Sequence, residues 1–361
     1  MTDREKEILN LIKLDPMISQ NELADTLGIK RSSVAVHISN LIKKGYIKGK
    51  GYVLTDSSQD VIVIGGSNID ITGFSSDLLI DGDSNPGSIS TSLGGVGRNI
   101  AENLARLNVN IKLLTALGDD NYGDRILMES KKVGIDMSLS AKYADVSTSV
   151  YLQVLDDDRD LKVAIADMKI VEKITPELLE KNITHLKNAK AIVADGNLRQ
   201  DVIEMLCNQF GDKLFFDTVS IKKSEKIKKC FGRIRTIKPN KREVEALLGL
   251  ELKTHEDIKT ALIKFQEAGV KTPVISLGEE GSAYLSNGEV FIQNPFKCDV
   301  ISVTGAGDAF MAGLVYSFVN GYELDEAVKH ATGVSAITLA SRSAVSEEMT
   351  ENNLIMKVEE N

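Results

Sequence analysis

The 361-residue sequence has few cysteines and no long apolar run. Its three cysteines, Cys207, Cys230 and Cys298, are scattered and never spaced as C-x-x-C. An odd number of cysteines without such spacing argues against a disulfide or zinc framework and is typical of a cytosolic protein. The N-terminus is charged from Asp3 onward, and no stretch is long and apolar enough to span a bilayer. We therefore expect a cytoplasmic protein that makes no membrane contact.

Several common site motifs are also absent. A Walker A pattern occurs nowhere in the chain. Gly95 and Gly97 are followed by Ile100, where a dinucleotide-binding fingerprint would need a third glycine. The acidic segment 156–160 lacks the ligand spacing of a calcium loop and indicates a solvated turn between two strands. The sequence thus offers no P-loop, no dinucleotide fingerprint and no EF-hand.

Residues 1–56 have a pattern of their own, and the chain is long enough for one large domain and a small one. Apolar residues at helical spacing predict a helix over residues 4–13. A capping box at 19–22 begins a second helix, which Gly28 ends, and a third helix follows from Lys30. Residues 45–54 alternate like a tight hairpin. Three helices and a hairpin predict a winged helix-turn-helix, and this segment resembles bacterial winged-helix repressor domains.

The charge of this first domain differs from that of the whole chain. The net charge of −9 argues against general affinity for nucleic acid, yet the region between Leu27 and Thr55 holds six basic residues and no acidic one. These residues lie at the ends of the third helix and on the hairpin, where phosphate contacts would be made. The residues expected to contact DNA are Lys30, Arg31, Ser32, Ser33, His37, Lys48 and Lys50. A solvated helix face, or a winged helix used for dimerisation, is the alternative.

After a polar linker at 55–60, apolar strands alternate with helices through residues 60–361. Residues 61–64 form a continuous apolar run, which is typical of a strand buried on both faces of a parallel sheet. Further strands expected at 191–194, 214–216, 234–237 and 274–277 end in polar or glycine-rich turns. This alternation predicts an α/β fold with a doubly wound, mostly parallel sheet. Residues 150–155 and 161–166 add an alternating β-hairpin.

The segment 303–313, Val-Thr-Gly-Ala-Gly-Asp-Ala-Phe-Met-Ala-Gly, organises the rest of the chain. Its glycine-rich turn leads into an apolar helix, whose unpaired N–H groups and dipole form an anion site. Gly305 and Gly307 let the backbone approach the anion closely. Asp308 lies beside this anion site, where a base would take a proton from a substrate hydroxyl. The arrangement is that of a phosphotransferase, although helix capping alone is an alternative.

Two other segments place polar residues beside glycine turns. Asn68 and Asp70 follow the strand at 61–64, and ligands of parallel sheets collect at the carboxyl ends of strands. Residues 93–107 begin Leu-Gly-Gly-Val-Gly-Arg-Asn and continue as a strongly apolar helix. Asn68 and Asp70 therefore point to the place where a substrate would lie. A simple turn after a strand is the alternative.

Together these segments resemble the ribokinase-like (PfkB) carbohydrate and nucleoside kinases. Residues 304–310 match the C-terminal signature of that family, residues 93–107 match its N-terminal signature, and Asn240-x-x-Glu243 matches its Asn-x-x-Glu motif. The resemblance implies ATP and Mg²⁺ as cofactors, an ordinary capped helix start being the alternative for Asn240 and Glu243. It implies Asp308 as the base, with the N–H groups of Gly305, Ala306 and Gly307 holding the phosphoryl charge.

The resemblance also implies the remaining contacts. The substrate would be bound by Asn68, Asp70, Gly94, Gly95, Asn99, Asp167 and Asn197. The nucleotide would be bound by Asn240, Ser276, Gly278 and Gly281, and the metal through Glu243. Strands within 71–93 and 147–168 would form a small β lid and the contact of a homodimer. Ser302 stands where many family members carry the Asp of a monovalent-cation loop, so dependence on potassium is left open.

Within the family, the segments 84–87, 94–101, 164–168 and 193–195 most resemble the bacterial pseudouridine kinases. This implies ATP-dependent phosphorylation of the 5′-hydroxyl of pseudouridine. A kinase for another nucleoside or sugar is the first alternative. A transcription regulator that uses the kinase fold only to sense a ligand is the second. An enzyme that also binds DNA is compatible with the whole sequence.

Overall fold

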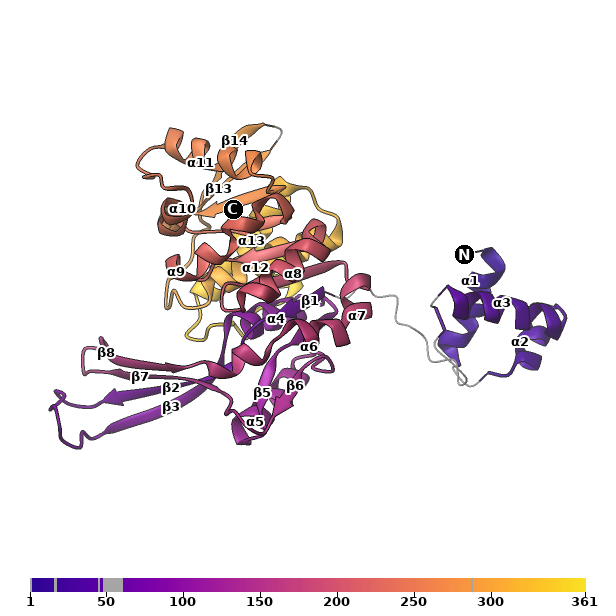
Figure 1. Ribbon diagram of the computed structural model, residues 1–361, viewed down its shortest axis with the longest axis horizontal. Coiled ribbons are helices and arrows are strands. Elements are labelled where there is room, and N and C mark those ends of the chain that lie inside the picture. Colours follow the sequence, from indigo (N-terminus) through magenta and orange to yellow (C-terminus); the bar gives the residue numbers. More distant parts are fainter. Residues whose placement is uncertain (1, 16–17, 45, 48–60, 287) are drawn as a thin grey trace. The chain divides into compact units, whose positions relative to one another are not determined.

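The computed structural model describes residues 2–15, 18–44, 46–47, 61–286 and 288–361 (Figure 1). The chain divides into two compact units, Met1–Gln59 and Asp60–Asn361. Each unit has its own hydrophobic core. None of the helices in the described ranges is long and apolar enough to cross a membrane.

The first unit is a small helical domain made of α1 (Asp3–Leu14), α2 (Gln20–Leu27) and α3 (Arg31–Lys43). Ser19 forms the expected capping box with Glu22 at the start of α2. Gly28 ends α2 in the left-handed region, with φ +62°, and a short turn leads into α3. The core includes Ile8, Leu23, Val34 and Ile47. Apart from residues 46–47, the predicted hairpin lies outside the described residues.

The second unit is built on an eight-stranded sheet with the order β14-β13-β12-β11-β10-β9-β1-β4. The six strands from β4 to β12 pair in parallel, and β13 and β14 continue the sheet antiparallel. The bounds are β1 (Val61–Ile64), β4 (Ile111–Leu114), β9 (Ala191–Asp195), β10 (Leu214–Asp217), β11 (Thr236–Lys238), β12 (Thr272–Ser276), β13 (Ser282–Ser286) and β14 (Glu289–Gln293). This mostly parallel sheet confirms the predicted fold class.

Helices cover both faces of this sheet. Ile62 and Ile64 of β1 belong to one core and Val61 and Val63 to the other, so β1 is buried on both sides as its continuous apolar run predicts. One face packs against α4 (Val96–Arg106), α12 (Ala306–Asn320), α13 (Leu324–Leu339) and α14 (Glu351–Glu359). The other packs against α6 (Pro176–Lys181), α7 (Ile183–Asn188), α8 (Gln200–Phe210), α10 (Lys241–Leu248) and α11 (His255–Glu267).

A separate four-stranded lid sheet extends away from the main sheet (Figure 1). Its order is β3-β2-β7-β8, with β2 (Asn68–Ser75), β3 (Gly87–Gly94), β7 (Ser149–Leu155) and β8 (Leu161–Asp167). The remaining elements are β5 (Ala116–Gly118), β6 (Ala141–Tyr143), α5 (Asn121–Lys132), α9 (Ile221–Ser224) and the 3₁₀ turns Lys169–Lys173, Gly211–Lys213, Glu225–Arg233 and Gly278–Glu280. Because β2 directly follows β1, the base of the lid stands at the carboxyl edge of the main sheet.

Candidate active site

The glycine turn predicted to hold an anion lies at the N-terminus of α12. Gly305 caps the helix with φ +83°, and a Cβ there would stand 2.0 Å from the carbonyl oxygen of Ala344. Only glycine fits this conformation and this contact. In the described part of the chain no side chain caps α12. The Ala306 N–H donates only a long, 3.4 Å hydrogen bond to the carbonyl oxygen of Val303, so the first turn of the helix can still offer its N–H groups to a ligand.

Asp308 lies in the first turn of α12, partly open to solvent. The side-chain amide of Asn99, at the start of α4, donates a 2.8 Å hydrogen bond to its Oδ2. Burial raises the pKa of Asp308 to about 7; the negative charge of Asp217 acts in the same direction, while Asn99 and Lys238 oppose the shift. A carboxyl group that titrates near neutral pH suits a general base.

Asp308 belongs to a carboxylate–lysine cluster with Asp195, Asp217 and Lys238. Asp195 and Asp217 end the neighbouring strands β9 and β10 in direct register. Lys238 ends β11, is only 6% exposed, and places its Nζ 3.1 Å from Oδ2 of Asp217. Burial raises the pKa of Asp195 to about 6. The cluster therefore gathers three carboxyl groups and one ammonium group at the carboxyl edge of the sheet.

The Lys238 ammonium group remains charged. Burial by itself would lower the pKa of Lys238, but the charges of Asp217, Asp308 and Glu243 outweigh burial and raise it above its ordinary value. The sequence patterns did not single out Lys238. The available signal was a lysine at the end of an apolar strand, two positions before Asn240.

Asn240 and Glu243 form the capping box of α10. A capped helix start was the alternative to a role for this Asn-x-x-Glu motif in binding Mg-ATP. Asn240 Oδ1 accepts the Glu243 N–H at 3.0 Å, and Glu243 Oε2 accepts the Asn240 N–H at 2.9 Å. Thr218 Oγ1 also donates to Glu243 Oε2, at 2.5 Å. Among the described residues, no three acidic, histidine or cysteine side chains form a metal cage. Mg²⁺ held mainly by phosphates and water needs few protein ligands, so the single carboxylate of Glu243 fits it.

The residues expected to bind the sugar meet at the base of the lid. The Asn68 amide donates to Oδ1 of Asp70, and burial raises the pKa of Asp70. A Cβ on Gly94 would stand 2.2 Å from Oδ2 of Asp70, so glycine leaves the space that the carboxylate occupies. Gly95, with φ +100°, begins α4 and accepts the Asn99 N–H at 2.8 Å. Asp70 thus lies against Gly94, and the adjoining Gly95 begins the helix whose Asn99 hydrogen-bonds Asp308.

Two other expected substrate residues lie differently. The register pairs Asp167 with Val150, and Val150 with Ile69, whereas Asp70 pairs with Tyr151. Residues paired in register share a face of a sheet, so Asp167 stands on the face opposite Asp70. Asn197 donates its N–H to Asp195 at 2.7 Å and accepts a hydrogen bond from Lys223. The structure thus brings Asn197 to the carboxylate–lysine cluster but does not bring Asp167 to the Asp70 face.

The expected nucleotide residues lie on two adjoining turns. Ser276 ends β12 and bridges to Asn240, since its N–H donates 2.9 Å to the carbonyl oxygen of Pro239. Gly278 and Gly281 have φ values of +66° and +88°. A Cβ on Gly281 would stand 2.0 Å from the carbonyl oxygen of Gln293, so that glycine also serves packing against β14.

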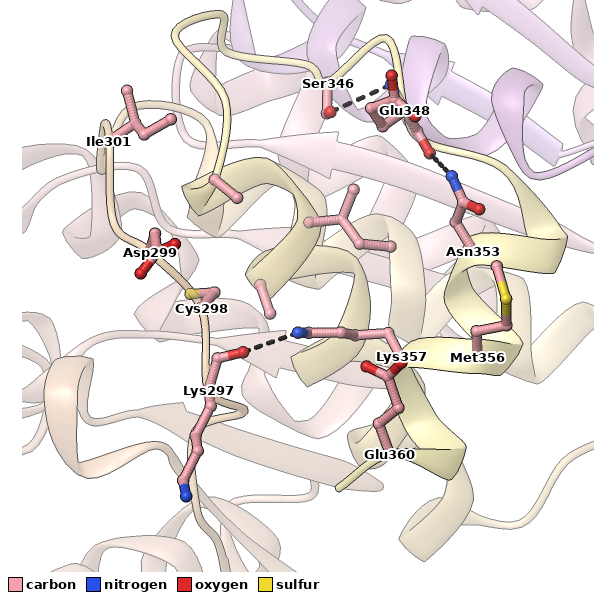
Figure 2. Close-up of a pocket in the computed structure, with 13 residues that line it drawn as sticks. Lys297, Cys298, Asp299, Ile301, Ser346, Glu348, Asn353, Met356, Lys357 and Glu360 are labelled. Carbon is pink, nitrogen blue, oxygen red and sulfur yellow. Dashed lines mark hydrogen bonds between the residues drawn. The ribbon is translucent and has the colours of Figure 1, made fainter.

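A cavity of about 730 Å³ lies between residues 297–301, α13 and α14 (Figure 2). Ala336 and Ile337 line it on α13, and Lys357 of α14 donates a 2.7 Å hydrogen bond to the carbonyl oxygen of Lys297. It contains no residue of the glycine turn or of the carboxylate–lysine cluster.

In the helical domain, α3 presents most of the residues expected to contact DNA. Lys30, Arg31, Ser32 and Ser33 are exposed, whereas His37 is half-buried. Val34, Ile38 and Leu41 face the core, and Val36, which we did not single out from the sequence, is 58% exposed on the opposite face. Lys44 pairs with Glu5 at 2.8 Å. Lys48 and Lys50 lie outside the described residues.

Comparison with known proteins agrees with both units. Residues 58–351 match the pfkB family of carbohydrate kinases, and residues 1–48 match winged helix-turn-helix DNA-binding domains. The chain is 39% identical to the uncharacterized sugar kinase YeiI of Escherichia coli, over 99% of both proteins. It is 38% identical to the pseudouridine kinase of Escherichia coli, over 83% of this chain and 96% of that enzyme.

A solved structure supports the fold. The crystal structure of a proposed sugar kinase from Clostridium perfringens superposes with a TM-score of 0.77 at 34% identity, covering 83% of this chain and 95% of that one.

Asp308→Asn tests both the base and its titration. Loss of the base should lower turnover on the order of 10²–10⁴-fold. The wild-type kcat/KM should rise with pH through about 7 as Asp308 loses its proton. A carboxyl group whose pKa is raised by folding stabilises the fold fully below its unfolded pKa of 3.8, and this contribution is lost as pH rises through about 7.

Asp308→Asn should therefore raise the Tm relative to wild type more at pH 8 than at pH 5.5, as measured by thermal unfolding. Asp81→Asn, at an exposed loop position, is the control for removing a surface charge. Near-normal turnover of Asp308→Asn, or an equal Tm change at both pH values, would contradict the assignment.

Proposed function

The chain belongs to the pfkB family of carbohydrate kinases, and from that premise we propose that it transfers the γ-phosphoryl group of ATP to the 5′-hydroxyl of pseudouridine. The observation that carries this proposal is the placement of Asp308. Its carboxyl group, with a pKa near 7, stands in the first turn of α12 and is held by Asn99 next to the N–H groups of that turn, which no side chain caps. The acceptor is proposed from the 38% identity with a pseudouridine kinase.

In this mechanism Asp308 accepts the proton of the 5′-hydroxyl while the hydroxyl oxygen attacks the γ-phosphorus of ATP, and ADP leaves as the bond between the γ-phosphorus and the bridging oxygen breaks. The N–H groups of Gly305, Ala306 and Gly307 hold the charge of the transferred phosphoryl group. Asn68, Asp70 and Asn99, with Gly94 and Gly95, orient the ribose. Asn240, Ser276, Gly278 and Gly281 hold the nucleotide, and Glu243 acts through water on Mg²⁺, which neutralises phosphate charge when bound.

The acceptor is tested by ADP release from Mg-ATP with pseudouridine, uridine, other ribonucleosides, ribose and fructose 6-phosphate. We expect the highest kcat/KM with pseudouridine and background release with ATP alone. The Asp308→Asn variant is the control for contaminating kinases. Higher kcat/KM with another acceptor would reject pseudouridine but keep the reaction. Saturable nucleoside binding without any turnover would instead favour the ligand-sensing regulator.

We also propose that the helical domain binds DNA through α3, which would join regulation to the enzyme. Lys30 and Arg31 stand exposed at its N-terminus, and Ser32 and Val36 lie on the exposed face. Hydroxyl groups read base edges, and an apolar side chain contacts the thymine methyl group.

Arg31→Ala should weaken binding to duplex DNA at every sequence and lower the slope of log K against log salt by about 1. Ser32→Ala should instead change sequence preference among duplexes selected from a random pool. Fluorescence anisotropy between 50 and 200 mM salt, about the range in which phosphate contacts are resolved, measures both effects. Lys13→Ala, an exposed lysine of α1, is the matched control. Equal losses in Arg31→Ala and Lys13→Ala would contradict this interface.

Finally, we propose a homodimer formed through the lid. On the face opposite Asp70, β3, β7 and β8 expose Ile89, Leu152, Val163 and Ile165, with Ile89 79% and Ile165 60% accessible. A contiguous apolar sheet face of this kind indicates a protein contact.

Ile165→Lys should convert the protein to a monomer, because it would bury an unpaired charge in that contact. Sedimentation velocity measures the change. Ala164→Lys, on the other face of the same strand, should leave the dimer intact. A monomeric wild type, or dissociation by both variants, would argue against the lid contact.

A further inference from the structure

We infer that Lys238 is a catalytic residue whose buried ammonium group contacts the phosphoryl group as it is transferred at the glycine turn. This inference rests on the proposed function and adds to it a side chain that the signature motifs do not include. The alternative is a purely structural lysine that neutralises Asp217.

The position of Lys238 points to the phosphoryl group. It ends β11 two residues before Asn240, one of the expected nucleotide residues. A Cβ on Gly307 would stand only 3.3 Å from its Nζ. Glycine at 307 therefore leaves the ammonium group next to the backbone that would hold the transferred group.

The charge of the site calls for such a cation. Asp195, Asp217 and Asp308 interact electrostatically with one another at the carboxyl edge of the sheet. Their charges would repel a phosphoryl group that the partial charges of the N–H groups attract. Lys238 also acts on Asp308 directly, since each residue shifts the pKa of the other towards its charged form. A fixed ammonium group offsets this repulsion where negative charge gathers during transfer.

The neighbouring turn holds the ammonium group in place. Asp217 contacts Lys238 through Oδ2, while its Oδ1 accepts the Val219 N–H at 3.0 Å. Val219 adopts φ +65°, a region that a β-branched residue rarely occupies. Strained backbone of this kind is found where a functional group must be held in one orientation. Asp217 therefore acts as a positioning residue for Lys238.

Variants at Lys238 and Asp217 separate the catalytic role from the structural one. Lys238→Met should lower kcat on the order of 10²–10³-fold, like the loss of an anion-hole donor, with little change in the KM of the nucleoside. Because Lys238→Met leaves Asp217 buried and unpaired, this variant risks unfolding. The double variant Lys238→Met/Asp217→Asn removes both charges and keeps the fold. Lys190→Met, which removes another partly buried lysine, should leave turnover unchanged.

A catalytic Lys238 predicts that the double variant is folded but as slow as Lys238→Met. A second readout needs no turnover, so it separates failure of this inference from failure of the proposed kinase reaction. The ratio of Mg-AMP-PNP affinity to Mg-ADP affinity, from calorimetry, should fall about tenfold in the double variant because the lysine contacts only the terminal group. Recovery of near-wild-type turnover by the double variant, or an unchanged affinity ratio, would overturn the inference.

Discussion

The ion pair between Lys238 and Asp217 is the interaction on which the candidate site depends. Parallel strands bring their carboxyl ends to one edge, and here β9 and β10 end there in aspartate. Two buried carboxylates beside Asp308 need a compensating charge, and the third strand, β11, ends in the lysine that supplies it. Removing one member of a buried pair typically costs about 3–5 kcal/mol. The same charge that makes the sheet edge stable also makes it suitable for a phosphoryl group.

Close backbone approach is the second constraint. Gly94 leaves room for the carboxylate of Asp70, and Gly305 sits against the carbonyl of Ala344. These contacts set the starts of α4 and α12 so that Asn99 of the first helix reaches Asp308 of the second, 209 residues later. The two glycine signatures are thus one structural unit. Each places a helix N-terminus, and the Asn99–Asp308 hydrogen bond fixes one relative to the other.

Local patterns in the sequence were sufficient to predict the fold class and the two glycine turns. A strand buried on both faces, such as β1, is recognised in the sequence as a continuous apolar run. A glycine turn before a helix is recognised from its own residues, without knowledge of the residues that it contacts. The features that the sequence patterns did not predict depend on contacts between residues far apart in the chain. Lys238 becomes significant only beside Asp217, and Lys44 pairs with Glu5. The face of the lid on which Asp167 lies depends on the register of β8 against β7, because a shift of one residue moves a side chain to the other face of the sheet.

The proposed lid contact bears on whether the two proposed activities influence each other. A ligand changes the affinity of a distant site for its own ligand only to the extent that it binds two states of the protein with different affinities. The two units have separate cores, so coupling between them needs an element that both ligands affect. In the proposed dimer the lid is that element, because one face carries Asp70 and the other carries Ile165. A winged helix that reads paired half-sites depends on dimer geometry. In such a dimer a bound nucleoside could alter DNA binding only by changing the subunit contact on the opposite face of the same strands.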